Sequence, residues 1–328
     1  MKDKTSKKLI NISSTILVIR TFKSFIPCRE ELKITSLRFF GLSVAMITML
    51  FSLLSLFIYG LNLGLDFTGG YLTEYSTKSF VSQQDMQRKL SDYLPEGFTV
   101  SSAKSGTEWS VRLAEDLGEG SSSHWLTDFV HTSGWAITPA DTMYIGSQVG
   151  EELINQGGLA LLTALIIVLS YLSFRFEWRL AIGSIAALFH DVLLVLGCFA
   201  WFGLSFDLTV LASLLAIIGY SLNDSIIVGD KVRELLKIEN TRTINDVIDD
   251  AVKAIFIRTL VTSGTTLATI CAVLFFAGSS LQGFAVSLFI GVVVGTFSSI
   301  SIAITIPQFL GLQRAHYWQK DQDICQLP

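Results

Sequence analysis

Three ionisable side chains interrupt long apolar runs in this chain: Asp191, Asp224 and Arg258. Asp224 lies in the stretch GYSLNDSIIVGDKVRE, within a run otherwise suited to a membrane helix. A charge at the centre of a bilayer costs at least about 2.5 kcal/mol, so such a residue needs a partner, a path for water or a proton. Asp224 is therefore the first candidate for ion or proton exchange.

Arg258 is the partner that the spacing indicates for Asp224. Asp224 lies six residues inward from Asp230, and Arg258 lies five residues inward from Lys253. At 1.5 Å per residue, both would lie about 8 Å below the same membrane surface on two antiparallel helices, so a contact is feasible. Burial favours the neutral acid, whereas a nearby guanidinium favours the carboxylate. The pair therefore suits proton exchange, in which protonation would release Arg258.

Each candidate also has a purely structural interpretation. Asp224 could be a hydrogen-bonded contact between helices, and Arg258 an interfacial anchor that reaches lipid headgroups. Asp191 follows His190 in the middle of another apolar run, which fits either a proton relay or a structural hydrogen bond. Sodium is the alternative coupling ion, because Ser and Asn flank Asp224, although a nearby arginine disfavours a cation. The sequence has no P-loop, metal-ligand cluster or catalytic triad, so we expect no cofactor and no enzyme activity.

The composition places these residues in a membrane. Only 16% of the residues are charged, against about 25% in typical soluble proteins. Charges are absent from 39–65, 153–174 and 259–313, and each run can cover the roughly 20 residues of a membrane helix. If one acid is tolerated in each of two further runs, six spans result. They lie near 39–59, 157–174, 180–202, 208–229, 256–277 and 283–309.

The basic residues predict the orientation of these spans, because short cytoplasmic loops are enriched in Lys and Arg. Residues 1–38 contain nine Lys and Arg residues, whereas the turns GLSFD and AGSSLQG contain none. The first span is longer than the apolar core of a cleaved signal peptide. We therefore predict a cytoplasmic extension (1–37), a first transmembrane helix (38–60), five further helices (153–310) and a cytoplasmic tail (311–328).

Residues 61–152 are expected to form a periplasmic domain between the first and second spans. YLTEYST alternates as a strand, Ser82 can cap a following helix, and KSGTE marks a hairpin turn between two strands. SSSHWLTDFVHTSG indicates a second helix, and a last strand is expected near 135–146. The order β-α-β-β-α-β is that of a ferredoxin-like fold. The predicted fold is a polytopic α-helical membrane protein with six transmembrane helices and one small α+β domain.

The stretch LGLDFTGG (63–70) joins the first span to this domain. Asp66 can cap or turn the chain, and the Gly69–Gly70 pair permits positive φ angles. Two interpretations remain open, a rigid structural joint and a hinge that transmits motion.

Several motifs in order resemble the SecF family, one half of the SecDF accessory of the bacterial Sec translocon. They are LGLDFTGG, FRFEWRLAIG, HDV, ASLLAIIGYSLNDSIIVGDKVRE and RTLVTSGTTLATI, within about residues 38–310. The resemblance implies an RND-superfamily protein of the bacterial inner membrane that uses the proton-motive force late in protein export. It implies that Asp224 and Arg258 belong to the proton pathway. Two residues, Gly229 and Lys231, depart from the family pattern. The residues that match the family signature are Asp66, Phe67, Thr68, Gly69 and Gly70.

The resemblance also implies partners. The superfamily arrangement uses two sets of six spans, and this chain has one, so a SecD-like subunit is expected. The other expected partners are the SecYEG translocon, a YajC-like accessory and the unfolded preprotein, and no basic stripe indicates nucleic acid. Two alternatives compete with a proton-driven subunit: half of a small-molecule RND exporter, which would need larger outer domains, and a passive translocon scaffold, in which Asp224→Asn would be silent.

Overall fold

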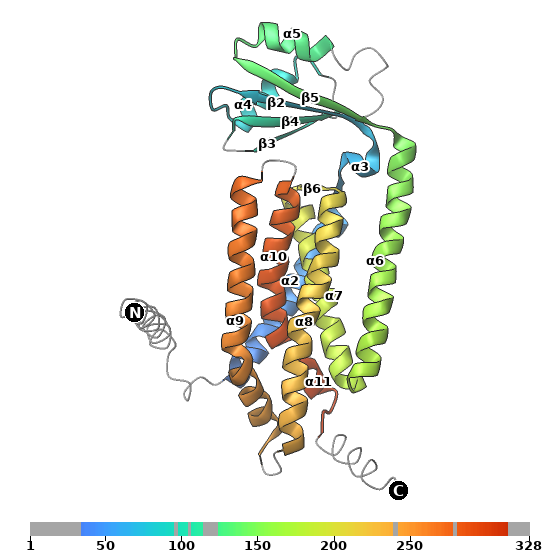
Figure 1. Cartoon of the computed structure of the whole chain (residues 1–328), viewed down its shortest axis with the longest axis vertical. Helices are drawn as coiled ribbons and strands as arrows, with labels where there is room; N and C mark the ends of the chain where they lie inside the picture. The colour runs from blue at the N-terminus through green and yellow to red at the C-terminus, as the bar shows by residue number, and fades with distance from the viewer. Residues whose placement is uncertain are drawn as a thin grey trace, which may run out of the picture.

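The computed structural model describes residues 34–94, 98–103, 106–113, 124–238, 242–277 and 281–313. Within these ranges, six helices long and apolar enough to cross a membrane run below a small α/β domain (Figure 1). They are α2 (Ile34–Tyr59), α6 (Ser147–Arg175), α7 (Trp178–Phe202), α8 (Leu208–Ile238), α9 (Ile244–Phe276) and α10 (Gln282–Ser301), the last continued by α11 (Thr305–Phe309). The predicted six-span architecture is confirmed. Most of the cytoplasmic extension and tail lies outside the described residues.

Helices α8 and α9 extend past the spans predicted near 208–229 and 256–277. They contain 31 and 33 residues, more than the roughly 20 that a bilayer core requires. A capping box starts α9: the Thr243 side chain accepts from the backbone N–H of Asp246, whose side chain accepts from the backbone N–H of Thr243. The connection between these two predicted spans is therefore mostly helix, because this cap and the long charged side chains favour helical structure there.

The last span is interrupted, whereas the sequence predicted a continuous run near 283–309. Helix α10 ends at Ser301, and α11 begins at Thr305 after a turn. Pro307 has no N–H to donate to the carbonyl of Ala303, four residues earlier, which explains the break. That carbonyl lies against Gly183 of α7, where a Cβ atom would not fit. The break thus lets α7 approach the end of α10 closely.

The outer domain, from β2 to β5, has the predicted β-α-β-β-α-β order. Its sheet has the strand order β3-β4-β2-β5, and all neighbouring strands are antiparallel. This is the ferredoxin-like arrangement that the sequence predicted. The elements are β2 (Gly70–Thr77), α4 (Gln83–Leu90), β3 (Thr99–Ala103), β4 (Glu108–Leu113), α5 (His124–Thr132) and β5 (Ile137–Ile145).

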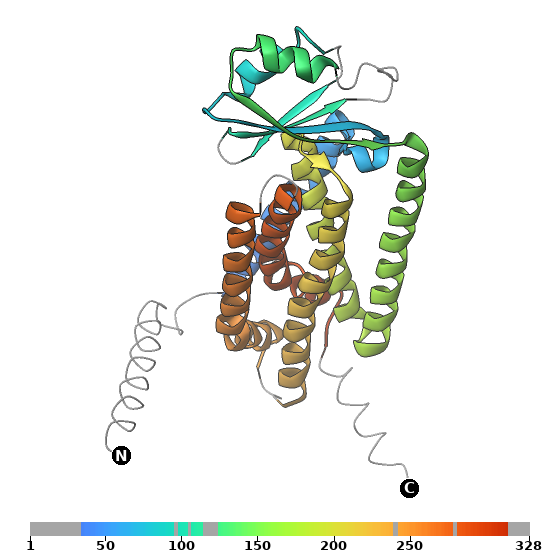
Figure 2. The same ribbon diagram turned by 45° about the horizontal axis from the view of Figure 1, so that its top comes forward.

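The two faces of this sheet differ, because side chains alternate along a strand. On β4, Trp109 and Val111 are buried in the core under α4 and α5. Burial also raises the pKa of the Tyr75 phenol in this core. Ser110 and Arg112 occupy the opposite face, which is turned toward the outer ends of the membrane helices (Figures 1 and 2). The outer domain therefore rests on the membrane domain with a polar face.

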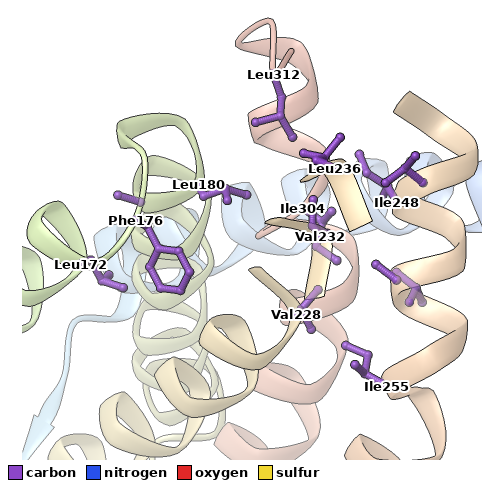
Figure 3. Packing of buried hydrophobic residues seen from close by; sticks show 14 residues of the cluster. Leu172, Phe176, Leu180, Val228, Val232, Leu236, Ile248, Ile255, Ile304 and Leu312 are labelled. Atoms are coloured by element: carbon purple, nitrogen blue, oxygen red, sulfur yellow. The ribbon is translucent and has the colours of Figure 1, made fainter. Parts of the chain in front are cut away.

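The cytoplasmic halves of α8 and α9 pack through a continuous apolar cluster (Figure 3). Val228, Val232 and Leu236, spaced four apart on α8, pack in one cluster with Ile248 and Ile255 of α9. Helix α6, by contrast, stands apart from the bundle, with only 6% of its apolar window buried (Figure 2). The cluster holds α8 and α9 antiparallel and so fixes the relative level of Asp224 and Arg258.

Candidate functional site

Asp224 is buried in the membrane domain on α8. Its exposed fraction is 3%, and it lies one helical turn before Val228 of the apolar cluster. Its Oδ2 atom has no hydrogen-bond partner among the described residues. A buried polar atom without a hydrogen-bond partner destabilises the protein. Protonation of this oxygen, or a donor that moves next to it, would therefore stabilise the site.

Arg258 lies at the predicted level but faces the exterior of the bundle. Fourteen residues separate Asp224 from Ile238 at the end of α8, and fourteen separate Arg258 from Ile244 at the start of α9. The side chain of Arg258 is exposed, and no ion pair joins it to Asp224 in the described part of the chain. Its charge nevertheless acts electrostatically on the Asp224 carboxyl. A role for the pair in proton exchange stays a prediction.

The threonines that follow Arg258 on α9 lie mainly on the exterior with it. Thr262, Thr265 and Thr266 each donate a hydrogen bond to a carbonyl of their own helix, at 2.9 to 3.0 Å. We call the set Arg258, Thr262, Thr265, Thr266 and Thr269 the polar face of α9. A polar face on a membrane helix is expected to meet protein or water rather than lipid.

Asp191 is the centre of a buried hydrogen-bond network. Its Oδ2 accepts from Ser221 Oγ at 2.5 Å and from Ser298 Oγ at 2.8 Å, and its Oδ1 lies 3.0 Å from His190 Nδ1. The His190 Nε2 atom lies 3.4 Å from Thr48 Oγ1. The network thus connects α7, α8, α10 and α2. Because both of its oxygens have partners, Asp191 differs from Asp224; its predicted part in proton transfer remains untested.

Sequence reasoning missed Ser298, although a signal for it was present. The signal is the pair Gly291 and Gly295 just before it, because small residues on membrane helices mark close contacts between helices. A Cβ atom at Gly295 would lie 3.3 Å from Ser221 Cβ and 3.4 Å from Asp191 Oδ2. The glycine therefore allows α10 to approach α7 and α8 closely enough for Ser298 to reach the carboxylate.

A second unpredicted contact joins α2 to α9 at their cytoplasmic ends. Arg38 Nε lies 3.0 Å from Asp249 Oδ1, and the Arg38 side chain is fully buried. The backbone N–H of Thr35 also donates to Asp249, at 3.0 Å. Arg38 had been counted only as one of the basic residues that indicate the cytoplasmic side.

The signature segment caps the helix that carries Asp224. Two short strands, β1 (Asn62–Leu63) and β6 (Ser205–Phe206), pair in parallel and bring the segment beside the start of α8. Asp66 Oδ2 then accepts from the backbone N–H of Leu208 at 2.9 Å. The free N–H groups at a helix start favour such a carboxylate. Asp66 therefore connects the end of the first span to the first turn of α8.

The other signature residues hold the same junction together. Phe67 is buried and stacks on Phe206, with the ring centroids 5.8 Å apart. Thr68 Oγ1 donates to the Gly64 carbonyl at 3.2 Å, within the short helix α3 (Leu65–Thr68). Gly69 and Gly70 both have positive φ angles, 71° and 124°. The chain can therefore turn sharply from α3 into β2.

Gly70 also meets the outer sheet at close range. A Cβ atom there would collide with the Leu113 carbonyl of β4. On the other side, Gly150 of α6 leaves room for the Phe67 carbonyl. The signature thus forms a joint between α2, α6, α8 and the outer sheet, and we refer to residues 64–70 as the joint.

Comparisons with known proteins match both the joint and the membrane domain. A family described as "Protein export membrane protein SecD/SecF, C-terminal" matches residues 127–313, and the "SecD/SecF GG Motif" matches residues 54–79. Proteins named "Protein translocase subunit SecF" from Vibrio alginolyticus and Pseudomonas aeruginosa are 38% and 37% identical. They cover 78% and 86% of this chain, which in turn covers 82% and 94% of theirs. The chain belongs to the SecF family. The predicted family membership is confirmed.

Solved structures of SecDF match this SecF-family chain over part of their length. The crystal structure of SecDF from Thermus, described as a translocon-associated membrane protein, superposes with a TM-score of 0.77 at 28% identity. The match covers 87% of this chain but 39% of the SecDF chain. A second SecDF structure, in a "Super-membrane-facing form", gives a TM-score of 0.60 at 30% identity. The SecF-family chain thus spans about two fifths of the SecDF chain that it matches, and it is a multi-pass protein of the bacterial inner membrane.

Proposed function

We propose that this SecF-family chain, with its SecD partner, uses the proton-motive force to promote late stages of protein export, and that Asp224 takes up and releases the proton. Asp224 is buried, and one of its oxygens has no donor in the part of the chain that the structure describes; this observation supports the proposal most strongly. An ionisable group within a membrane span is a functional candidate by default.

The polar face of α9 supports a proton path shared with the SecD partner. Arg258 is exposed on the exterior of this chain, and ionisable residues in spans almost always face protein or water. Asn223, beside Asp224 on α8, is exposed as well. When the partner covers this face, the Arg258 charge lies at the interface near Asp224. The ionised carboxylate of Asp224 would attract this charge more strongly than the neutral acid would.

Helix α8 supplies the mechanical connection to the outer domain. It is continuous from Leu208 to Asp224, so sixteen residues, or about 24 Å, separate the proton site from the turn that Asp66 caps. A shift of α8 along or about its axis would act directly on the joint. The joint contacts the outer sheet through Gly70, so the outer domain would change its orientation as Asp224 gains or loses a proton.

The available energy matches the contacts that must change. Moving one charge across 100 mV provides about 2.3 kcal/mol. Hydrogen bonds between membrane helices contribute about 0.6 kcal/mol on average and at most about 1.7 kcal/mol. The energy of one proton therefore corresponds to about one to four such contacts. The outer domain would then hold the emerging preprotein and prevent its return to a SecYEG-type channel, with a YajC-like accessory as a further partner.

The test is export in cells whose own copy is replaced by Asp224→Asn. Asp230→Asn is the matched control, because Asp230 lies on the same helix in a surface ion pair with Arg175, at 2.8 Å. We expect Asp224→Asn to arrest late export at normal membrane levels and Asp230→Asn to export normally. Normal export by Asp224→Asn would favour a passive scaffold. Export that follows a sodium gradient rather than a proton gradient would identify the other ion.

A further inference from the structure

A polar cavity lies between the outer domain and the membrane domain. Its volume is about 470 Å³, within the range of roughly 300 to 1,000 Å³ found for ligand clefts. One wall comes from α4, β3 and β4, and the other from β1, β6, Asp207 just before α8, and the outer ends of α7 and α10. Amides and hydroxyls dominate its lining, including Asn62, Gln83, Gln87, Ser102, Ser205 and Gln282.

One border of this cavity is an edge of the outer sheet with which no other described strand pairs. Strand β3 is the terminal strand of the order β3-β4-β2-β5. Gln83 Nε2 donates to the Val100 carbonyl at 3.0 Å, so this carbonyl points away from β4. The direction in which the N–H and C=O groups point repeats every second residue along a strand. Those of Ser102 therefore also point away from β4. Both residues line the cavity, and such an edge can pair with another extended chain.

The charges around the cavity do not favour a charged ligand. Arg112 and Asp207 contribute one charge of each sign to the lining. Asp207 Oδ1 already accepts from the backbone N–H of Val210 at 2.9 Å. The buried Nε of Arg112 has no acceptor among the described residues, which leaves a donor that an arriving carbonyl could use after a small shift.

The polar lining also argues against a permanent subunit contact. The centres of lasting interfaces are usually apolar, whereas this cavity presents mainly amides and hydroxyls. Those groups can bond to the main chain of any polypeptide, whatever its side chains. The chemistry therefore fits a transient and sequence-tolerant ligand.

We propose that the edge of β3 and this cavity bind an extended segment of the exported polypeptide by strand addition. Main-chain hydrogen bonds to Ser102 would hold the segment, and the amides of Gln87 and Gln282 would bond to its free side. The five residues of β3 can align about 17 Å of extended chain. This inference rests on the proposed role in protein export.

The position of the cavity connects binding to movement of the joint. Asn62 lies two residues before the joint, and Asp207 directly precedes Leu208, whose N–H bonds to Asp66. One wall belongs to the outer domain and the other to the membrane domain. A change in their relative orientation would therefore widen or narrow the cavity, which would release or grip the bound segment.

The first test is photocrosslinking in membranes that contain the complete complex, including the SecD partner. A photoreactive residue replaces Ser102 in one variant and Thr138 in a control variant; Thr138 is exposed on β5, the other terminal strand. A preprotein is stalled during ATP-driven translocation without a proton-motive force. We expect crosslinks to the preprotein from position 102 and at least fivefold fewer from position 138. Crosslinks from position 102 to the partner subunit or to lipid only, or none at all, would overturn the proposal.

A second test isolates the main-chain contact. Ser102→Pro removes the outward N–H without removing a bond to β4, and proline is tolerated on an edge strand in this orientation. Ser102→Ala loses the hydroxyl and keeps the N–H. With the photoreactive residue at Gln87, we expect Ser102→Pro to lower the crosslink yield severalfold and Ser102→Ala to lower it much less. Equal yields from the two variants would contradict strand addition.

The two proposals can fail separately. Because the stalled preprotein is crosslinked without a proton-motive force, Asp224→Asn should not alter the yield at position 102. Crosslinking combined with normal export by Asp224→Asn would support the binding site and refute proton coupling at Asp224. Arrested export without crosslinking at position 102 would support the coupling and refute the binding site.

Discussion

Replacing Asp191 with alanine removes the acceptor on which three donors from three helices converge. Ser221 and Ser298 bond to Oδ2, and His190 lies beside Oδ1. The carboxylate is fully buried, so water cannot easily take its place. Ser298 can fall back on the Gly295 carbonyl, at 3.2 Å. The loss therefore falls mainly on Ser221 and His190.

The expected cost follows from these contacts. Two hydrogen bonds lost outright, those of Ser221 and His190, at about 0.6 kcal/mol on average and about 1.7 kcal/mol at most, give about 1 to 3.5 kcal/mol of lost unfolding free energy. The upper part of this range applies because hydrogen bonds to charged groups are the stronger ones. Asp191→Asn keeps an oxygen that can accept from both serines, so it should lose less than half as much. Ser298→Ala removes one bond and should cost about 0.6 kcal/mol.

Tryptophan fluorescence monitors the unfolding of the purified complex in detergent. Export by the same variants is then measured in cells. We expect the stabilities to follow the order wild type, Ser298→Ala, Asp191→Asn, Asp191→Ala. A loss below about 0.5 kcal/mol for Asp191→Ala would refute the structural account of this network. Stable Asp191→Asn protein that no longer exports would instead show that Asp191 takes part in proton transfer.

Three further predictions concern the joint and the cytoplasmic ends. Gly70→Ala should lower the free energy of unfolding by about 3 kcal/mol or more, because of backbone strain and the collision with β4. Gly60→Ala is the control: Gly60 has φ 66° but lies in open space, so this variant should lose only about 1 to 2 kcal/mol. Equal thermal midpoints for the two variants would contradict this prediction. Asp66→Ala should cost about 1 kcal/mol by loss of the helix cap and reduce export, whereas Asp66→Asn, which keeps an acceptor, should behave nearly as wild type in both assays. Arg38→Ala should cost about 3 to 5 kcal/mol because the Asp249 carboxylate loses its ion-pair partner, and adding Asp249→Leu should restore most of the thermal stability.

The spans and the outer domain could be predicted because their signals are local. Runs without charge define membrane helices, and alternation with turn residues defined the strands, including the hairpin at KSGTE. Helix ends were less predictable, since the extension of α9 depends on the cap between Thr243 and Asp246. The break at Pro307 has a local signal, but its contact with Gly183 depends on how α7 packs.

Contacts between distant residues could not be predicted in the same way. Asp66 bonds to a residue 142 positions later, and Asp191 to Ser298, 107 positions later. Counting residues gave the matched depth of Asp224 and Arg258, but depth does not fix the direction of a side chain about the helix axis. Each residue turns by about 100°, and packing sets Asp224 inward and Arg258 outward.

The most direct test of proton coupling uses inner-membrane vesicles with a preprotein stalled late in translocation after ATP is exhausted. A proton-motive force is then imposed, and the completion of translocation is measured for wild type, Asp224→Asn and Asp230→Asn. We predict that the force completes translocation in wild type and Asp230→Asn but leaves the stalled preprotein unchanged in Asp224→Asn. Completion at the wild-type rate in Asp224→Asn would contradict the central claim that this buried carboxyl couples proton movement to export.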